Sequence, residues 1–155
     1  MFILTHAAVG AVIARVVPGQ PWAIAALAFA AHFLADIIPH GDSELYNDYV
    51  SGAKVKRAIA IVTVDALVSL AFAVFLLISV DPAWRFDLGV GILAGVLPDL
   101  LVAIYELSRS RFLAWFHRLH FFFHNLVTSR TGDLSLRNGF IVEFIAVAVL
   151  FLKLF

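Results

Sequence analysis

Histidine and aspartate recur at one-turn intervals in an otherwise apolar stretch, HFLADIIPH, at residues 32–40. On an α-helix, residues four apart lie about 40° from each other around the axis, so His32 and Asp36 share a face. His40 follows at the same interval, but Pro39 is expected to end the helix before it. Imidazole and carboxylate groups on one face indicate a site for a divalent cation.

Further ionisable residues lie near one end of other apolar segments. They are His6, Asp65, Asp99 and Glu143. If the chain alternates across a membrane, all four fall in the same half of the bilayer as Asp36. A charged group in hydrocarbon costs about 2.5–3.5 kcal/mol, so groups at one depth are expected to satisfy each other. A bound cation does so, because it neutralises carboxylates and accepts imidazole lone pairs.

The segment HRLHFFFH adds three histidines, whose steps of three and seven residues place them within about 60° on a helix. Histidine with carboxylate suits Zn, Mn, Fe or Ni better than Ca or Mg. We expect one or two ions, with Zn or Mn preferred. The expected ligands are His6, His32, Asp36, Asp99, His117, His120 and His124. Membership of His40 and Glu143 is left open.

Each of these residues also has a structural interpretation. His6 is accounted for by a hydrogen bond, Asp65 by an ion pair with a nearby Lys or Arg, and Glu143 by a pair with Arg118 or Arg137. Asp99 follows Pro98, which frees a helical carbonyl, so it is also consistent with a bridge across a kink. The shared depth favours a common polar site over separate accidents.

Composition indicates an integral membrane protein. The 155 residues suggest a single domain, 1–155, of which 63% are hydrophobic and only 14% charged, with a mean hydropathy of +0.98. Soluble domains are nearer half apolar and one quarter charged. Net charge is zero and there is no basic patch interleaved with aromatic residues, so a nucleic-acid partner is not expected. There is no cysteine, so any metal must be held by histidine and carboxylate.

Apolar runs predict an all-α membrane protein with about five transmembrane helices, near the ~20 residues needed to cross a bilayer. The predicted spans are 2–17, 21–39, 58–80, 86–107 and 139–155. The first is expected to be a retained helix, because no basic segment precedes it as in a cleaved signal peptide. Residues 111–127 predict an interfacial or re-entrant helix, with a sixth span as the alternative.

Lysine and arginine predict the orientation. With five spans, the N-terminus and both long loops share one side. That side carries Lys54, Lys56, Arg57, Arg109, Arg111, Arg118, Arg130 and Arg137, against Arg15, Arg85 and Lys153 on the other. Basic residues are enriched in cytoplasmic loops. The N-terminus, the loop around Asp48 and residues 108–137 are therefore expected in the cytoplasm.

Three motifs resemble the YdjM-like inner-membrane proteins, a family described as membrane-bound metal-dependent hydrolases. They are HFLAD in the second span, LPDL at 97–100 and HRLHFFFH at 117–124, with TH at 5–6 resembling the family's early histidine. Leu100 and Leu101 stand where the family usually has a second acid and a histidine, and HxxxD precedes LPD here. The resemblance implies a bacterial or archaeal cytoplasmic membrane and a hydrolase, with no defined substrate.

Two functions fit these residues. The first is a metal-dependent hydrolase that acts at the cytoplasmic face on a lipid or prenyl phosphoester. Asp65 or Asp99 would serve as general base, and Arg118 would hold an anionic group. The alternative is a metal-ion or proton transporter that uses the same cluster, although the far halves of the spans look apolar. A structural protein that binds a partner would leave the histidines unexplained, and the sequence does not define the oligomeric state.

Overall fold

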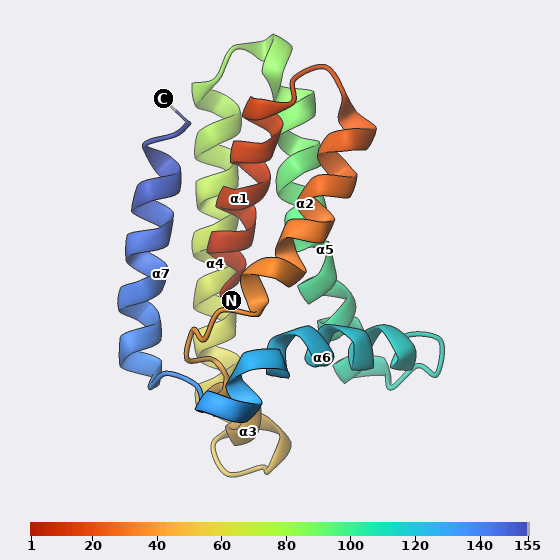
Figure 1. Cartoon of the computed structure of the whole chain (residues 1–155), viewed down its shortest axis with the longest axis vertical. Helices are drawn as coiled ribbons and strands as arrows, with labels where there is room; N and C mark the ends of the chain where they lie inside the picture. The colour runs from red at the N-terminus through yellow and green to blue at the C-terminus, as the bar shows by residue number, and fades with distance from the viewer. Residues whose placement is uncertain (155) are drawn as a thin grey trace.

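The chain folds into an all-helical bundle, and the computed structural model describes residues 1–154 (Figure 1). Its elements are α1 (Ile3–Val16), α2 (Pro21–Asp36), α3 (Ser43–Val50), α4 (Val55–Ser79), the 3-10 turn η1 (Pro82–Trp84), α5 (Arg85–Ser108), α6 (Ala114–Thr131) and α7 (Leu136–Phe151). The described residues contain no strand. The predicted all-α class is confirmed, and α6 provides the extra helix expected near 111–127.

The number of membrane-length helices is smaller than predicted. Two segments, Val55–Ser79 and Pro82–Ser108, are long and apolar enough to cross a membrane. Helices α6 and α7 pass the same test only as a pair, bent by 120° at their junction, so residues 1–154 provide two or at most three spans. The expectation of five spans is therefore corrected.

The correction has a simple geometric cause. Helix α1 has 14 residues, and α2 and α7 have 16 each. At 1.5 Å per residue they reach only about 21–24 Å, short of a hydrocarbon core of roughly 30 Å. The hydropathy of residues 21–39 suggested a longer second span, but the helix already ends at Asp36.

Helix α1 lies at the centre of the arrangement. It packs against α2, α4, α5 and α7, which run alongside it, whereas α6 crosses one end of the bundle near α3 (Figure 1). The polar end residues of α1, α2 and α5 therefore face α6. This end carries the candidate site.

Glycines allow α1 and α5 to approach until their backbones touch. A Cβ on Gly10 would overlap the carbonyl oxygen of Gly91, and one on Gly91 would overlap the carbonyl oxygen of Gly10. One turn along, a Cβ on Gly95 would lie 2.5 Å from the carbonyl oxygen of His6. The contact holds His6 of α1 beside the end of α5 that bears Asp99.

Gly10→Ala is expected to destabilise the protein by about 1–3 kcal/mol, because the added methyl group meets rigid backbone of α5. Displacement of α1 should also weaken metal binding through His6. The control is Gly89→Ala on the same α5 helix, where a Cβ meets nothing within 4 Å. Thermal unfolding in detergent would measure both variants, and equal midpoints would show that the tight α1–α5 contact is absent.

Candidate metal centre

Five side chains from four helices converge at the end of the bundle, and we name them the inner centre. They are His6 of α1, His32 and Asp36 of α2, Asp99 of α5 and His120 of α6. His6 Nε2 lies 3.1 Å from Asp36 Oδ1, and His32 Nε2 lies 3.1 Å from Asp36 Oδ2. His120 Nε2 lies 3.6 Å from Asp36 Oδ2. Three imidazole nitrogens thus surround one carboxylate.

Asp99 approaches the same three nitrogens from the α5 side. Its oxygens lie 3.6 Å from His32 Nε2, and 3.9 Å from both His6 Nε2 and His120 Nε2. Ligand atoms of His6, His32 and Asp36 lie within 4.8 Å of one another, and so do those of His32, Asp99 and His120. The two groups share His32, so the five side chains form one continuous set of donors.

Hydrogen bonding leaves Nε2 of His32 with a free lone pair. His32 Nδ1 lies 2.8 Å from the carbonyl oxygen of Gly95, which can only accept, so Nδ1 carries the proton. In the neutral ring, Nε2 then points a lone pair at Asp36 and Asp99. Five buried atoms of the inner centre have no hydrogen-bond partner: His6 Nδ1, His32 Nε2, Asp36 Oδ2, Asp99 Oδ2 and His120 Nδ1. Buried acceptors facing each other require a proton or a cation between them.

The inner centre is closed to solvent except at Asp99. The side chains of His6, His32 and Asp36 are 0% exposed, and that of His120 is 5% exposed. Asp99 is 21% exposed. Any small molecule that reaches the inner centre would therefore approach along Asp99.

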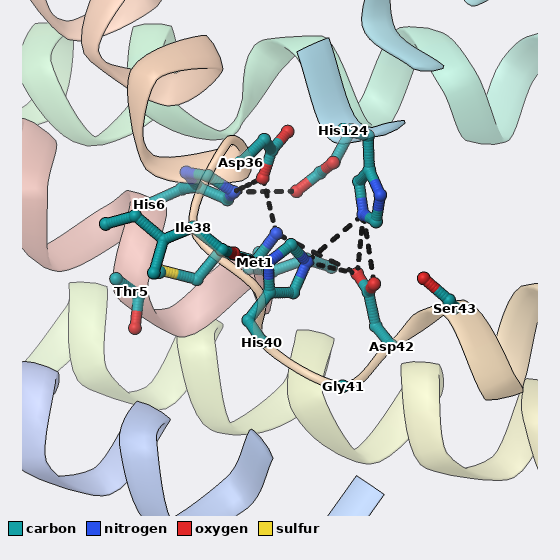
Figure 2. Close-up of polar contacts among 12 residues, drawn as sticks. Met1, Thr5, His6, Asp36, Ile38, His40, Gly41, Asp42, Ser43 and His124 are labelled. Carbon is teal, nitrogen blue, oxygen red and sulfur yellow. Dashed lines mark hydrogen bonds and ion pairs between the residues drawn. The ribbon is translucent and has the colours of Figure 1, made fainter. Parts of the chain in front are cut away.

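A second group, which we name the outer cluster, adjoins the inner centre. It consists of His40 and Asp42, which follow α2, and His124 of α6 (Figure 2). Asp42 lies 2.9 Å from each Nε2, and the two Nε2 atoms lie 3.1 Å apart. Burial opposes protonation of His40, but the hydrogen bond and the charge of Asp42 outweigh it and raise the pKa of His40.

A positive group lies between the two sets. The ammonium group of Met1 contacts Asp36 and lies 3.8 Å from Asp42 Oδ2 (Figure 2). Both carboxylates thus face the same small region.

Asp133 fixes the backbone that carries the outer cluster. Its carboxylate accepts hydrogen bonds from the backbone N–H groups of His40, Gly41, Ser43 and Leu134, at 2.8–3.1 Å. Burial opposes its ionisation, but these bonds outweigh burial and hold the pKa of Asp133 below its usual value. Gly41 has a φ of 83°, which glycine adopts without strain. The loop is thus set by the junction between α6 and α7.

Asp133→Asn is expected to lower the free energy of unfolding by about 1 kcal/mol at neutral pH, because an amide donor replaces one accepting oxygen. The pKa of Asp133 is lower in the folded state, so its contribution is present above the unfolded pKa. It disappears as pH falls through the folded value. The unfolding curves of wild type and variant should therefore differ at neutral pH and converge at acidic pH. Asp81→Asn is the control, since asparagine caps η1 equally well; a neutral-pH effect as large in Asp81→Asn would refute the assignment.

Two predicted site carboxylates lie at the start of α1. Asp65 accepts hydrogen bonds from the N–H groups of Ile3 and Leu4, at 2.8 and 3.4 Å. Glu143 accepts from the hydroxyl group of Thr5 and, at 3.0 Å, from its N–H group. Both therefore satisfy N–H groups that a helix leaves free in its first turn. They hold the helix that carries His6 and are outside the three metal-competent groups found among the described residues.

The remaining predicted site residues lie along another side of α6. His117 Nε2 lies 2.9 Å from Glu106 and 3.4 Å from the hydroxyl group of Tyr46. Arg118 lines an open groove together with Arg130. The structure thus places His117 and Arg118 apart from His120, which belongs to the inner centre.

Asp42, Asp133 and Glu106 were not anticipated from the sequence, and His40 was left open. Asp42 and Asp133 lie in polar loops, where an acid is ordinarily solvated. The only local signal was the closeness of Asp42 to His40.

Comparison with known proteins adds no identification. No family model matches the chain, and neither the curated proteins nor the solved structures include a significant match. The donor set is therefore interpreted from its own chemistry. Imidazole and carboxylate donors at these separations fit a first-row divalent ion.

Proposed function

We propose that this protein is a membrane-embedded, metal-dependent hydrolase whose metal is held by the inner centre. The observation that carries the proposal is the convergence of three Nε2 atoms and two carboxylates, with buried acceptors left facing each other. Zn or Mn, as one or two ions, suits these donors. The resemblance to YdjM-like proteins supports the same class.

Such an ion, when bound, would act as a Lewis acid and would make a bound water nucleophilic at neutral pH. Asp99 is suited to take the proton from the attacking water, because it alone connects the inner centre with the outside. Asp65 was also expected as the base. Both of its oxygens are engaged by the α1 backbone, which favours Asp99 and leaves Asp65 to position His6.

The proposed substrate class is a lipid or prenyl phosphoester at the cytoplasmic membrane surface. Helix α6 crosses one end of the bundle (Figure 1) and supplies His120 to the inner centre. If this end lies at the membrane surface, the inner centre would be at the depth of a lipid phosphate. On another side of α6, the groove combines Arg118 and Arg130 with Phe121 and Phe122. Two guanidinium groups beside aromatic rings suit a phosphate with an apolar tail. Arg118 would thus hold the anionic group.

The test is hydrolysis of lipid phosphates and soluble phosphoester analogues by detergent-solubilised protein loaded with Zn or Mn. Asp99→Asn should retain fold, size and bound metal but lose at least about 100-fold in turnover, as expected for a general base and not for a ligand. Asp81→Asn, at the opposite end of the bundle, is the matched control. If no phosphoester is turned over with either metal, the hydrolase proposal fails. Metal-coupled flux into proteoliposomes would then support the transporter alternative.

Orientation in the membrane can be tested with introduced cysteines, because the chain has none of its own. Cysteines in place of Asn47 and Ser129 should label only from the cytoplasmic side, since α3 and α6 lie at one end of the bundle. A cysteine in place of Ala83, in η1 at the other end, should label from outside in intact cells. The reverse pattern would invert the proposed orientation, and labelling of residues 47 and 129 from opposite sides would contradict the bundle.

A further inference from the structure

We propose that His40, Asp42 and His124 form a second divalent-cation site, separate from the inner centre. The proposal goes beyond hydrolysis, because it concerns an ion with its own ligands and its own exchange with solvent. It applies whether the inner centre is catalytic or carries ions. The ion proposed for this site is a first-row divalent cation such as Zn²⁺.

The separations within the outer cluster match those around a bound ion. Zinc–nitrogen bonds are about 2.0–2.1 Å, so two ligands on a tetrahedral zinc lie roughly 3.3 Å apart. His40 Nε2, His124 Nε2 and Asp42 Oδ2 are separated by 3.1, 2.9 and 3.2 Å. Small outward shifts of the side chains would admit the ion.

The protonation pattern leaves an unsatisfied face on the cluster. His40 Nδ1 lies 2.5 Å from the carbonyl oxygen of Ile38, so Nδ1 carries the proton and Nε2 faces His124 Nε2. In a neutral His40 ring, the Nε2 lone pair would face both Asp42 and His124 Nε2. Asp42 Oδ1 is buried and lies 2.9 Å from His124 Nε2. His40, wholly buried, is thus aimed at a position where a cation satisfies all three donors.

The support around the cluster is that of a built site. The carbonyl group of Ile38 fixes the ring of His40, as carbonyl groups commonly do for metal-binding histidines. Asp133 holds the loop that carries His40 and Asp42 through the N–H groups of His40, Gly41 and Ser43. Helix α6 supplies His124 one turn after His120.

The two sites are neighbours but are assembled from different parts of the chain. The rings of His120 and His124 have centroids 6.0 Å apart, and each belongs to a different group. The outer cluster takes two of its three ligands from the loop after α2, which contributes none to the inner centre. The ions can therefore bind separately. Asp42 is 24% exposed, so the outer ion should exchange faster than an ion held by Asp36.

Zinc stoichiometry of the purified full chain separates this proposal from a cluster that only shares protons. His124→Ala should bind one zinc fewer than wild type, and His120→Ala, one turn away on the same helix, should keep the outer zinc. A chelator added to wild type should remove one zinc at least about 10-fold faster than the rest, in line with the exposed Asp42. Equal zinc content in His124→Ala and wild type would overturn the second site.

A measurement on the unaltered protein covers the case in which the variants fail to fold. With ¹⁵N-labelled histidine, zinc should shift the Nε2 resonances of both His40 and His124. If zinc shifts the signals of His32 and His120 but leaves those two unchanged, the outer cluster binds only protons and the proposal is wrong. Hydrolysis is not used in either measurement, so failure of the second site and failure of the hydrolase proposal are distinguishable.

Discussion

Asp36→Ala is expected to lower metal affinity more than any other single change, by at least about 100-fold. Loss of a residue that merely supports a ligand already costs 10–100-fold. Asp36 is fully buried, and its two oxygens lie 3.1–3.6 Å from the Nε2 atoms of His6, His32 and His120. The variant leaves three imidazoles and only Asp99 as an anion. Competition with a chelating dye would measure the affinity.

Asp87→Ala provides the matched control for Asp36→Ala. Asp87 lies in the first turn of α5 and accepts a hydrogen bond from Gly19 in the loop between α1 and α2. Its removal deletes a carboxylate of the same size without touching either candidate site. Equal zinc affinity for Asp36→Ala and wild type would exclude Asp36 as a ligand and leave the inner centre without its central anion.

Local periodicity predicted which residues of α2 act together. His32 and Asp36 share a face because helical geometry depends only on spacing, and the structure places both in the inner centre. The shared depth of His6 and Asp99 likewise follows from their positions near segment ends. His120 joins them because α6 crosses that end of the bundle.

The outer cluster could not be predicted in the same way. His40 follows the end of α2, and its direction depends on the turn through Pro39 and on the hydrogen bonds of Asp133, which lies 93 residues away in the sequence. Asp42 looks like an ordinary loop acid until His124 is placed opposite it. Such partners depend on tertiary contacts, which spacing along one helix does not encode.

Hydropathy also misjudged where helices end. It averages over residues and so extended the second span through residues 37–39, whereas the backbone leaves the helix after Asp36. The same averaging hid α3, whose residues Ser43–Val50 are polar overall but form two turns that bury Leu45. Apolar content therefore predicted the all-helical class correctly but overestimated the number of helices long enough to cross a membrane.

Metal removal is expected to have the largest effect on stability. Without a metal ion, Asp36 Oδ1 contacts the ammonium group of Met1, but Asp36 Oδ2 and His32 Nε2 stay buried without a hydrogen-bond partner, which is costly in a water-free region. A ligand present at 1,000 times its dissociation constant stabilises the folded state by about 4 kcal/mol. Zinc at saturation should raise the thermal midpoint of detergent-solubilised wild type accordingly, and chelation should reverse the rise. Asp36→Ala should show little response to zinc, whereas Asp87→Ala should respond like wild type. If neither zinc nor chelator changes the wild-type thermal midpoint, the buried acceptors of the inner centre are satisfied by protons and not by a metal ion.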